Sequence, residues 1–447
     1  MKQQSVKAIK LDSSPQESVT AFGGMGVVQR LALRLGVRKL LERGLPERSG
    51  QYSIPDVVFA SAIGLLSGAR GTASLEAIRQ DPAMLKLIGV AQVPTGTTLW
   101  RLWEEVGEAS AAMSAVSLKL ARSVISRAPR RGLRDNAFVP VFIDGTLLEG
   151  SSRREGTKVI GDKGTGLLWT VGFVGPHAVD QVLCAPGEGE QTAARALIRR
   201  IDKGLLQPEG LRRDALVLMD SLHGDGPTFD LLEERDLNYV VGVNKLERSE
   251  SVMEELPESE WTPTPEYDAQ RGVRESAVCT AWLQCERWGT KRLMIGRRWR
   301  RPGEFLWRYA AVATNLAPGD KRLGGKATAG EFARAIWALY NRKGACENHF
   351  KNLLRDMRLH NPPCQQWVRN AGYYAIGQLA GLLGTAVEAL TSEPGAARSS
   401  IATLRRWVMA VPGRVIAHAR TVGVTILGLT QEWHAEIERR FNRAARC

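Results

Sequence analysis

Cysteine is scarce in this chain and shows no paired spacing. Six cysteines occur among 447 residues, at positions 184, 279, 285, 346, 364 and 447. None belongs to a C-x-x-C pair of the kind found in structural zinc sites, and no regular spacing indicates a disulfide framework. Neither kind of site is therefore expected, and a reducing cytosol fits this cysteine usage best.

Apolar segments suited to targeting or membrane insertion are also missing. The first residues, Met1-Lys-Gln-Gln-Ser5, lack the apolar core of a signal peptide. The most apolar stretch, Ala371 to Val387, carries no charge, but it is rich in glycine and slightly short for a bilayer. We predict a buried helix there and expect a cytoplasmic, nucleoid-associated protein with no membrane partner.

Negative charge is in short supply relative to positive charge. Lysine plus arginine number 61 and aspartate plus glutamate 47, so the formal net charge is +14. A surplus of this size favours a polyanionic partner, most often nucleic acid, although ribosomal, membrane-surface and merely basic proteins share it. The length exceeds that of one ordinary core, so two or three globular domains are expected.

Residues 1–130 are expected to form an all-α N-terminal DNA-binding domain. A turn at Pro94 precedes a helix with Thr97, Thr98 and Arg101 on its first turn, which suits the recognition helix of a helix-turn-helix. The alternative is an ordinary bundle helix whose apolar residues fill a core. Those residues are Leu99, Trp100, Leu102 and Trp103. The pattern slightly favours the bundle helix.

Residues 135–390 alternate between strand and helix patterns, which is typical of an α/β domain with a central sheet. Phe138 to Asp144 is a short apolar run ending in an acid, and Ala215 to Asp220 repeats the device. Each run predicts a buried strand that delivers a carboxylate at its C-terminal end, where chemistry collects in open sheets. Asp144 before Gly145 could instead be a turn acid, and Asp220 a helix cap.

A β-rich segment, 245–334, interrupts this domain, and a basic region, 398–447, follows it. Within the insertion, residues 287–301 carry seven basic and no acidic residues. The DNA contacts predicted there are Arg297, Arg298, Trp288 and Trp299, with Trp307 just beyond. Such a strand pair could follow a phosphate backbone and stack an unpaired base. It could equally be an exposed hairpin whose tryptophans pack on the domain beneath.

A third acid lies in the segment Tyr340-Asn-Arg-Lys-Gly-Ala-Cys-Glu-Asn-His-Phe-Lys351. The segment belongs to a long predicted helix that starts near Ala329 and meets no proline before Pro362. Steps of three and four residues place Tyr340, Lys343, Glu347, Lys351 and Leu354 on one face. We expect Glu347 to face inward, toward the sheet, between two lysines. A solvated helix face with weak ion pairs is the alternative.

Asp144, Asp220 and Glu347 together predict a metal-dependent site. Clustered carboxylates repel one another unless a cation neutralises them. Hard oxygen ligands with room for substrate oxygens select magnesium or manganese. Two such ions about 4 Å apart can activate a nucleophile and stabilise the leaving oxygen of a phosphoryl displacement. This chemistry suits the cutting and rejoining of DNA.

The spacing of these acids and the helix around Glu347 resemble DDE transposases of bacterial insertion sequences, most closely insertion-sequence family thirteen-eighty. The intervals are 220 − 144 = 76 and 347 − 220 = 127, and the second is long enough for that group's β-rich insertion. The helix resembles the group's Tyr-Arg-Glu-Lys signature, with Gly before and Asn after the glutamate. Lys343 and Leu354 depart from its arginine and lysine positions, and Gly145-Thr146 stands where many relatives have Asp-Thr.

The resemblance implies an RNase-H-like central mixed sheet with a β-rich insertion, preceded by the all-α domain. It implies that Asp144, Asp220 and Glu347 are catalytic and hold two Mg²⁺ or Mn²⁺ ions. The enzyme would be a cut-and-paste transposase, cleaving at insertion-sequence ends and transferring strands to target DNA. A metal nuclease without strand transfer and an inactive end-binding protein are the alternatives.

The same resemblance implies DNA contacts and partners. Tyr340, Lys343, Lys351 and Arg355 would position phosphates near the scissile bond. A tryptophan of the insertion, with Trp299 first, would stack on a base flipped out in a hairpin step. The partners would be transposon-end DNA with terminal inverted repeats, target DNA and a second protomer in a synaptic complex.

Overall fold

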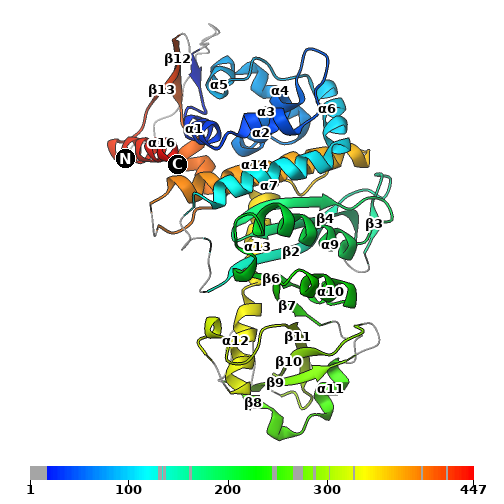
Figure 1. The fold of residues 1–447 in the computed structure, drawn as a ribbon. Coiled ribbons are helices and arrows are strands. Elements are labelled where there is room, and N and C mark those ends of the chain that lie inside the picture. Colours follow the sequence, from blue (N-terminus) through cyan, green and yellow to red (C-terminus); the bar gives the residue numbers. More distant parts are fainter. Residues whose placement is uncertain are drawn as a thin grey trace, which may run out of the picture.

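The computed structural model describes residues 18–128, 133, 137–160, 164–243, 249–264, 275–284, 288–301, 303–325, 328–393, 396–418 and 421–447. The protein is a mixed α/β fold in which a helical part lies at one end and a large sheet extends toward the other (Figure 1). The boundary residues 130, 135 and 245 of the predicted domains lie outside the described residues.

The large sheet has ten strands in the order β3-β4-β2-β6-β7-β11-β10-β9-β8, with β5 beside β4. The strands from the first half of the chain are β2 (Val139–Glu149), β3 (Lys158–Val159), β4 (Thr165–Val174), β5 (His177–Leu183), β6 (Ala215–Met219) and β7 (Asn238–Gly242). Strands β2, β6 and β7 run parallel, whereas β4 is antiparallel to both β2 and β5. The apolar runs that end at Asp144 and Asp220 form β2 and β6, as predicted.

Strand β2 is longer than predicted, and this changes the position of Asp144. The strand was expected to end at Asp144, but antiparallel pairing with β4 carries it on to Glu149, which pairs with Gly166. Its parallel pairing with β6 stops earlier, at Phe142 and Leu218. Asp144 therefore lies inside a strand, not in a turn, but just past the part of β2 that β6 covers.

The β-rich insertion continues the same sheet. Its strands are β8 (Thr262–Pro263), β9 (Glu275–Leu283), β10 (Arg292–Arg300) and β11 (Arg308–Thr314), and α11 (Ser249–Glu255) precedes them. Strand β11 pairs antiparallel with β7, so the last strand of the insertion joins the edge of the sheet that carries the two aspartates. The insertion and the α/β part thus share hydrogen bonds and core.

Helices cover both faces of the sheet near the aspartates. They are α9 (Glu190–Ile201), α10 (Gly226–Glu234), α12 (Ala329–Asn341), α13 (Gly344–Lys351) and α14 (Trp367–Thr391). Alternate residues of a strand point to opposite faces. Phe142 of β2 lies beside His349 of α13, with ring centroids 5.6 Å apart, whereas a Cβ on Gly172 of β4 would meet Ile201 of α9. Asp144, two residues after Phe142, therefore points to the α13 face, and Gly145 points to the α9 face.

The N-terminal part is a helical bundle around α14. Its helices are α1 (Met25–Leu35), α2 (Val37–Gly44), α3 (Ile54–Ser67), α4 (Gly71–Ala77), α5 (Pro82–Ile88), α6 (Gly96–Glu108) and α7 (Ser110–Ile125). Helix α14 packs against α3, α6 and α7 on one side and against β5 on the other, and the prediction of a buried helix there is confirmed. It therefore ties the bundle to the sheet.

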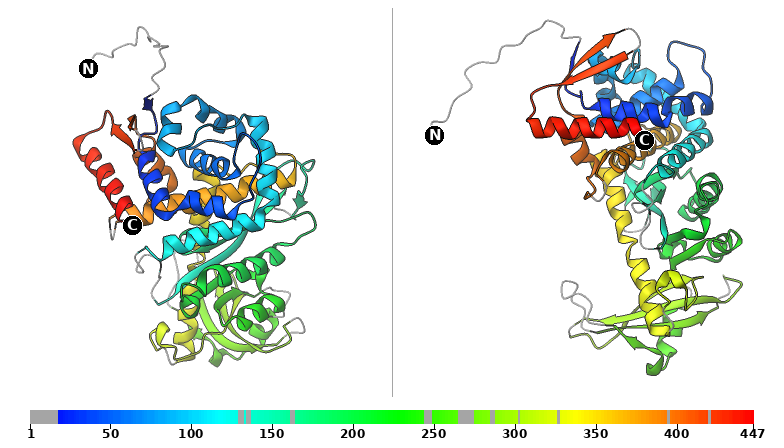
Figure 2. Two further views of the ribbon diagram at one scale, coloured as in Figure 1. Left: turned by 45° about the horizontal axis from the view of Figure 1, so that its top comes forward. Right: turned by 60° about the vertical axis from the view of Figure 1, so that its left-hand side comes forward.

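The C-terminal region completes the N-terminal part. Strands β12 (Gly413–His418) and β13 (Thr421–Ile426) pair antiparallel. Val19–Thr20 (β1) adds to this pair, so the N-terminal part is not entirely helical. The last helix, α16 (Gln431–Arg446), lies along α1 (Figure 2), where Arg30 stacks on Phe441 at 4.1 Å.

Within the described part, no single helix has the length and hydropathy to cross a membrane. The helices Ile54–Ser67 and Gly71–Gln80 meet those criteria only when counted together, and they are bent by 98°.

Candidate active site

Asp144 and Asp220 occupy equivalent positions on neighbouring parallel strands. The last parallel pair joins Phe142 to Leu218, and each aspartate follows two residues later. Both side chains therefore leave the sheet on the face that α13 covers. Asp220 Oδ1 accepts a hydrogen bond from the Leu222 backbone at 3.0 Å, so this aspartate also caps a short 3₁₀ turn, Ser221–His223.

Asp144 lies in a partly buried and electrostatically strained environment. Its Oδ2 accepts a hydrogen bond from Lys343 Nζ at 3.0 Å, and its side chain is 19% exposed. Burial raises the pKa of Asp144 above its ordinary value, Lys343 lowers it, and the negative charges of Asp220 and Glu190 raise it again. Carboxylates gathered in this way favour binding of a cation.

The helix that carries Glu347 is not continuous, which corrects the predicted single helix. Helix α12 ends at Asn341, and α13 begins at Gly344. Between them the backbone N–H groups of Arg342 and Lys343 donate to carbonyl oxygens three residues back, which tightens the turn. Lys343 consequently reaches Asp144.

Glu347 itself is exposed, which differs from the inward orientation that was expected. Helix α13 packs on the sheet through Cys346 and Phe350 instead, and Glu347 lies beside that contact. Burial raises the pKa of the Cys346 thiol, and the negative charges of Asp144, Glu347 and Asp220 add to the rise. The three predicted acids thus all contribute to the electrostatic environment of one buried thiol, which Lys343 partly offsets.

Tyr340 closes the site from the end of α12. A Cβ placed on Gly242 would come within 2.8 Å of the Tyr340 hydroxyl, so the phenol lies directly against β7. Burial raises the pKa of Tyr340, Lys343 lowers it, and Asp220 and Asp144 raise it. Of the predicted phosphate contacts, Tyr340 and Lys343 thus lie beside the aspartates.

The two remaining predicted phosphate contacts lie farther along the helix. Lys351 is exposed and donates to Asn348 Oδ1 at 3.2 Å. Arg355 is also exposed, and it lies in a π-helical turn, Asn352–Asp356, that follows α13. That turn, like the break after α12, shifts these residues out of the register of one straight helix.

The predicted DNA contacts of the insertion divide into two buried side chains and two side chains beside α12. Trp288 is 1% exposed and packs edge-on against Phe229 of α10, and it therefore offers no surface for stacking. Arg298 is 7% exposed, pairs with Glu258 and lies over the Trp307 ring. Both belong to the core, which corrects their predicted role as DNA contacts.

Arg297 and Trp299 lie on the other face of β10, next to α12. The Arg297 guanidinium lies 5.6 Å from the Trp299 ring and 5.9 Å from the ring of Trp337 on α12. Trp299 is only partly buried. This face borders the helix that leads to Lys343 and Glu347.

The predicted helix-turn-helix residues lie at the start of α6. Thr97 and Arg101 are exposed and Thr98 is partly buried. Leu99, Leu102 and Trp103 are buried, as a bundle helix requires, whereas Trp100 is 40% exposed and does not fill the core. The helix thus packs on α14 with one face and leaves the other face at the surface.

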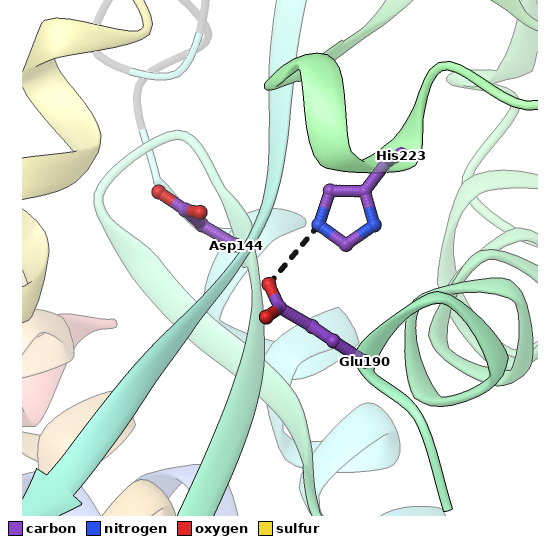
Figure 3. Close-up of side chains that lie close together, drawn as sticks. All are labelled: Asp144, Glu190 and His223. Carbon is purple, nitrogen blue, oxygen red and sulfur yellow. Dashed lines mark ion pairs between the residues drawn. The ribbon is translucent and has the colours of Figure 1, made fainter. Parts of the chain in front are cut away.

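Two residues beside Asp144 were missed from the sequence. Glu190, the first residue of α9, and His223 each place a possible ligand atom within 4.8 Å of one another and of Asp144 (Figure 3). The Nε2 atom of His223 lies 3.2 Å from Glu190 Oε1 and 3.8 Å from Asp220 Oδ1. The spacing of three residues between Asp220 and His223 was the available signal.

Comparisons with known proteins identify the family of this chain. The family model described as "Transposase DDE domain group 1" matches residues 2–434. No curated protein matches the chain. A cryo-EM structure of piggyBac transposase in a synaptic complex with hairpin DNA is similar at a TM-score of 0.42 and 14% identity, covering 86% of this chain and 76% of that one. The chain belongs to the DDE transposase family and is a DNA transposase, an enzyme of a family that works with divalent metal ions.

Proposed function

We propose that Asp144, Asp220 and Glu347 are the catalytic acids, and that they hold two Mg²⁺ or Mn²⁺ ions during end cleavage and strand transfer. One observation carries this assignment: Asp144 and Asp220 follow neighbouring parallel strands in register, and Glu347 lies on α13, the helix that covers the same face of the sheet. The donor set fits hard cations, because carboxylate oxygens are their preferred ligands. Bound ions would activate the attacking hydroxyl and stabilise the leaving oxygen.

In this proposal the Lys343 ammonium group neutralises Asp144 when no cation is bound. The ammonium group lies 3.0 Å from Asp144, where it neutralises a carboxylate that would otherwise face Asp220 and Glu190. With Asp144 holding a cation, Lys343 would be free to contact a DNA phosphate. Tyr340, adjacent on the same turn, orients that phosphate, and Lys351 and Arg355 extend the contact along the backbone.

Trp299 is our candidate for stacking on a flipped base. It is partly exposed, and Arg297 lies on its ring on the α12 side of the insertion. A base stacked there would be held between an aromatic face and a nearby cation. Trp288 cannot compete for this role without leaving the core.

The strand order β5-β4-β2-β6-β7 supports an RNase-H-like catalytic domain over residues 135–390. Three antiparallel strands are followed by two that run parallel to the first. We further propose that the N-terminal region, 1–130, binds transposon-end repeats through the exposed start of α6. The basic region 398–447 adds phosphate contacts, and two protomers synapse two ends. Membership of insertion-sequence family thirteen-eighty fits the long insertion.

A cleavage and joining assay tests the three acids separately. Asp220→Asn and Glu347→Gln should each reduce nicking of transposon-end duplexes and joining of pre-cleaved ends by more than the 10–100-fold typical of outer-shell changes. Glu42→Gln, an exposed glutamate on α2, is the matched control and should leave both steps unchanged. A Glu347→Gln enzyme with normal cleavage would remove Glu347 from the site, and the same result for Asp220→Asn would remove Asp220.

A further inference from the structure

A second set of metal-binding side chains meets at Asp144 from the opposite face of the sheet. Glu190 begins α9, which packs on the face of β2 away from α13, and His223 ends the 3₁₀ turn after Asp220. One ligand atom from each of Asp144, Glu190 and His223 lies within 4.8 Å of the other two. The proposed catalytic acids, Asp144, Asp220 and Glu347, assign no function to Glu190 or His223.

Gly145 makes the approach of Glu190 possible. A Cβ on Gly145 would lie 2.3 Å from Glu190 Oε1 and 2.4 Å from its Cδ, far closer than real contacts allow. The Glu190 carboxylate therefore rests on the bare Cα of the residue next to Asp144. Strand β6 has already stopped pairing with β2 at this level, which leaves the edge of β2 accessible.

His223 is built into the cluster and points at it. Its side chain is 0% exposed, and among the described residues neither ring nitrogen has a hydrogen-bond partner of acceptable geometry. A buried imidazole without partners is costly. Figure 3 shows the ring turned toward Glu190, whose side chain is 13% exposed. A cation bound between them would satisfy one nitrogen.

The separations suit ligands of one ion. Two adjacent ligands of an octahedral ion, each about 2.1 Å from it, lie about 3 Å apart. The separation between His223 Nε2 and Glu190 Oε1 is 3.2 Å. Two carboxylate oxygens and one imidazole nitrogen favour a transition ion such as Mn²⁺ or Zn²⁺ over Mg²⁺, because imidazole is a poor ligand for magnesium.

We propose that Asp144, Glu190 and His223 form a divalent-cation site of mixed oxygen and nitrogen donors that shares Asp144 with the catalytic acids. This rests on the proposed function only in taking Asp144 as the shared ligand. It makes Glu190 a fourth acid of the metal centre and gives this chain a preference for manganese at that position. It also explains why glycine occupies position 145, where many relatives have aspartate: any side chain there would displace the Glu190 carboxylate.

Electron paramagnetic resonance of the Mn²⁺-loaded protein, without DNA, tests the site. Pulsed measurements detect coupling to a ¹⁴N nucleus only when an imidazole binds the ion. The unaltered protein should show this coupling, and His223→Gln should lose it. Glu190→Gln should weaken Mn²⁺ binding by about tenfold or more, the scale of losing a supporting interaction at a metal site.

Gly145→Ala keeps the test decisive if the buried His223 variant fails to fold. This change alters no ligand but displaces Glu190, so it should weaken Mn²⁺ binding as Glu190→Gln does. Absence of ¹⁴N coupling in the unaltered protein would overturn the proposal, as would unchanged Mn²⁺ affinity in both Glu190→Gln and Gly145→Ala. In that case Glu190 and His223 are an ordinary structural pair.

Glu347→Gln separates this proposal from the catalytic assignment. It should lose cleavage but keep the ¹⁴N coupling. If the Glu347→Gln enzyme stays active and keeps the coupling, Glu347 is not a catalytic acid, but the site with Glu190 and His223 is supported. If the variant loses activity and the unaltered protein shows no coupling, the catalytic assignment is supported and the site with Glu190 and His223 is wrong.

Discussion

Gly372 is the point at which α14 crosses α6 in backbone contact. A Cβ on Gly372 would lie 1.9 Å from the Trp103 carbonyl oxygen and 2.9 Å from the Gly107 nitrogen. Real Cβ atoms stay at least 3.0 Å from such atoms, so Gly372→Ala must push the two helices apart by about 1 Å. The displaced face includes the fully buried Leu102 and Trp103.

The expected cost follows from two opposing effects. Overpacking of a filled core costs about 1–3 kcal/mol, and the backbone here has little freedom to relax, so we expect about 3 kcal/mol. Alanine regains about 1 kcal/mol over glycine through helix propensity. The net loss for Gly372→Ala should be about 2 kcal/mol, seen in urea unfolding followed by tryptophan fluorescence.

Gly384→Ala on the same helix is the matched control. Its Cβ would meet only side-chain atoms, Leu66 Cδ2 at 3.0 Å and Ile401 Cδ1 at 3.1 Å, which can shift. The propensity gain is the same, so this variant should be as stable as the parent or slightly more stable. Equal unfolding curves for the two variants would refute the idea that backbone contact at Gly372 holds the N-terminal bundle to α14.

Three further predictions follow from buried groups and from the site. Burial lowers the pKa of His349 to about 4 and that of His177 to about 3. Below about pH 6.5 the unfolded chain therefore takes up protons that the folded chain does not, and the free energy of unfolding should fall by roughly 2 kcal/mol per histidine between pH 7 and pH 5. Urea unfolding at both pH values checks this, and His349→Gln should reduce the dependence of stability on pH. Lys343→Met should tighten Mn²⁺ binding several-fold in calorimetry while slowing cleavage, because a cation no longer competes for the neighbouring carboxylate; weaker binding would show that Lys343 supports the ion. Trp299→Ala should reduce joining with little change in stability, whereas Trp288→Ala should cost about 3–5 kcal/mol, and the opposite pattern would reverse their assignment to surface and core.

Local sequence patterns were sufficient for the elements that depend on local forces. The apolar runs ending at Asp144 and Asp220 predicted two buried strands, and β2 and β6 are those strands. The strands of the insertion and the helix Trp367–Thr391 were also predicted, because alternation and helical periodicity report which side of an element is buried. The charge balance likewise predicted a nucleic-acid partner without any knowledge of shape.

Other features depend on partners that are distant in the chain. The end of β2 is set by β4, whose Gly166 pairs with Glu149, and the run of apolar residues before Asp144 carries no trace of that partner. The faces on which Arg298 and Trp299 lie depend on the register of β10 between β9 and β11. A helix that looks continuous in sequence is broken at Lys343, where that lysine meets Asp144.

The sequence alone predicted that Asp144 and Asp220 end buried strands and that Glu347 lies on a helix, because residue types and their spacing are local properties. Only the tertiary structure decided which side chains meet at Asp144. Glu190 looks like an ordinary acid at the start of a helix, and His223 is a single histidine in a short turn. They join Asp144 because Gly145 leaves room and β6 ends early, and apart from the spacing between Asp220 and His223 such packing between separate strands leaves no pattern along the chain.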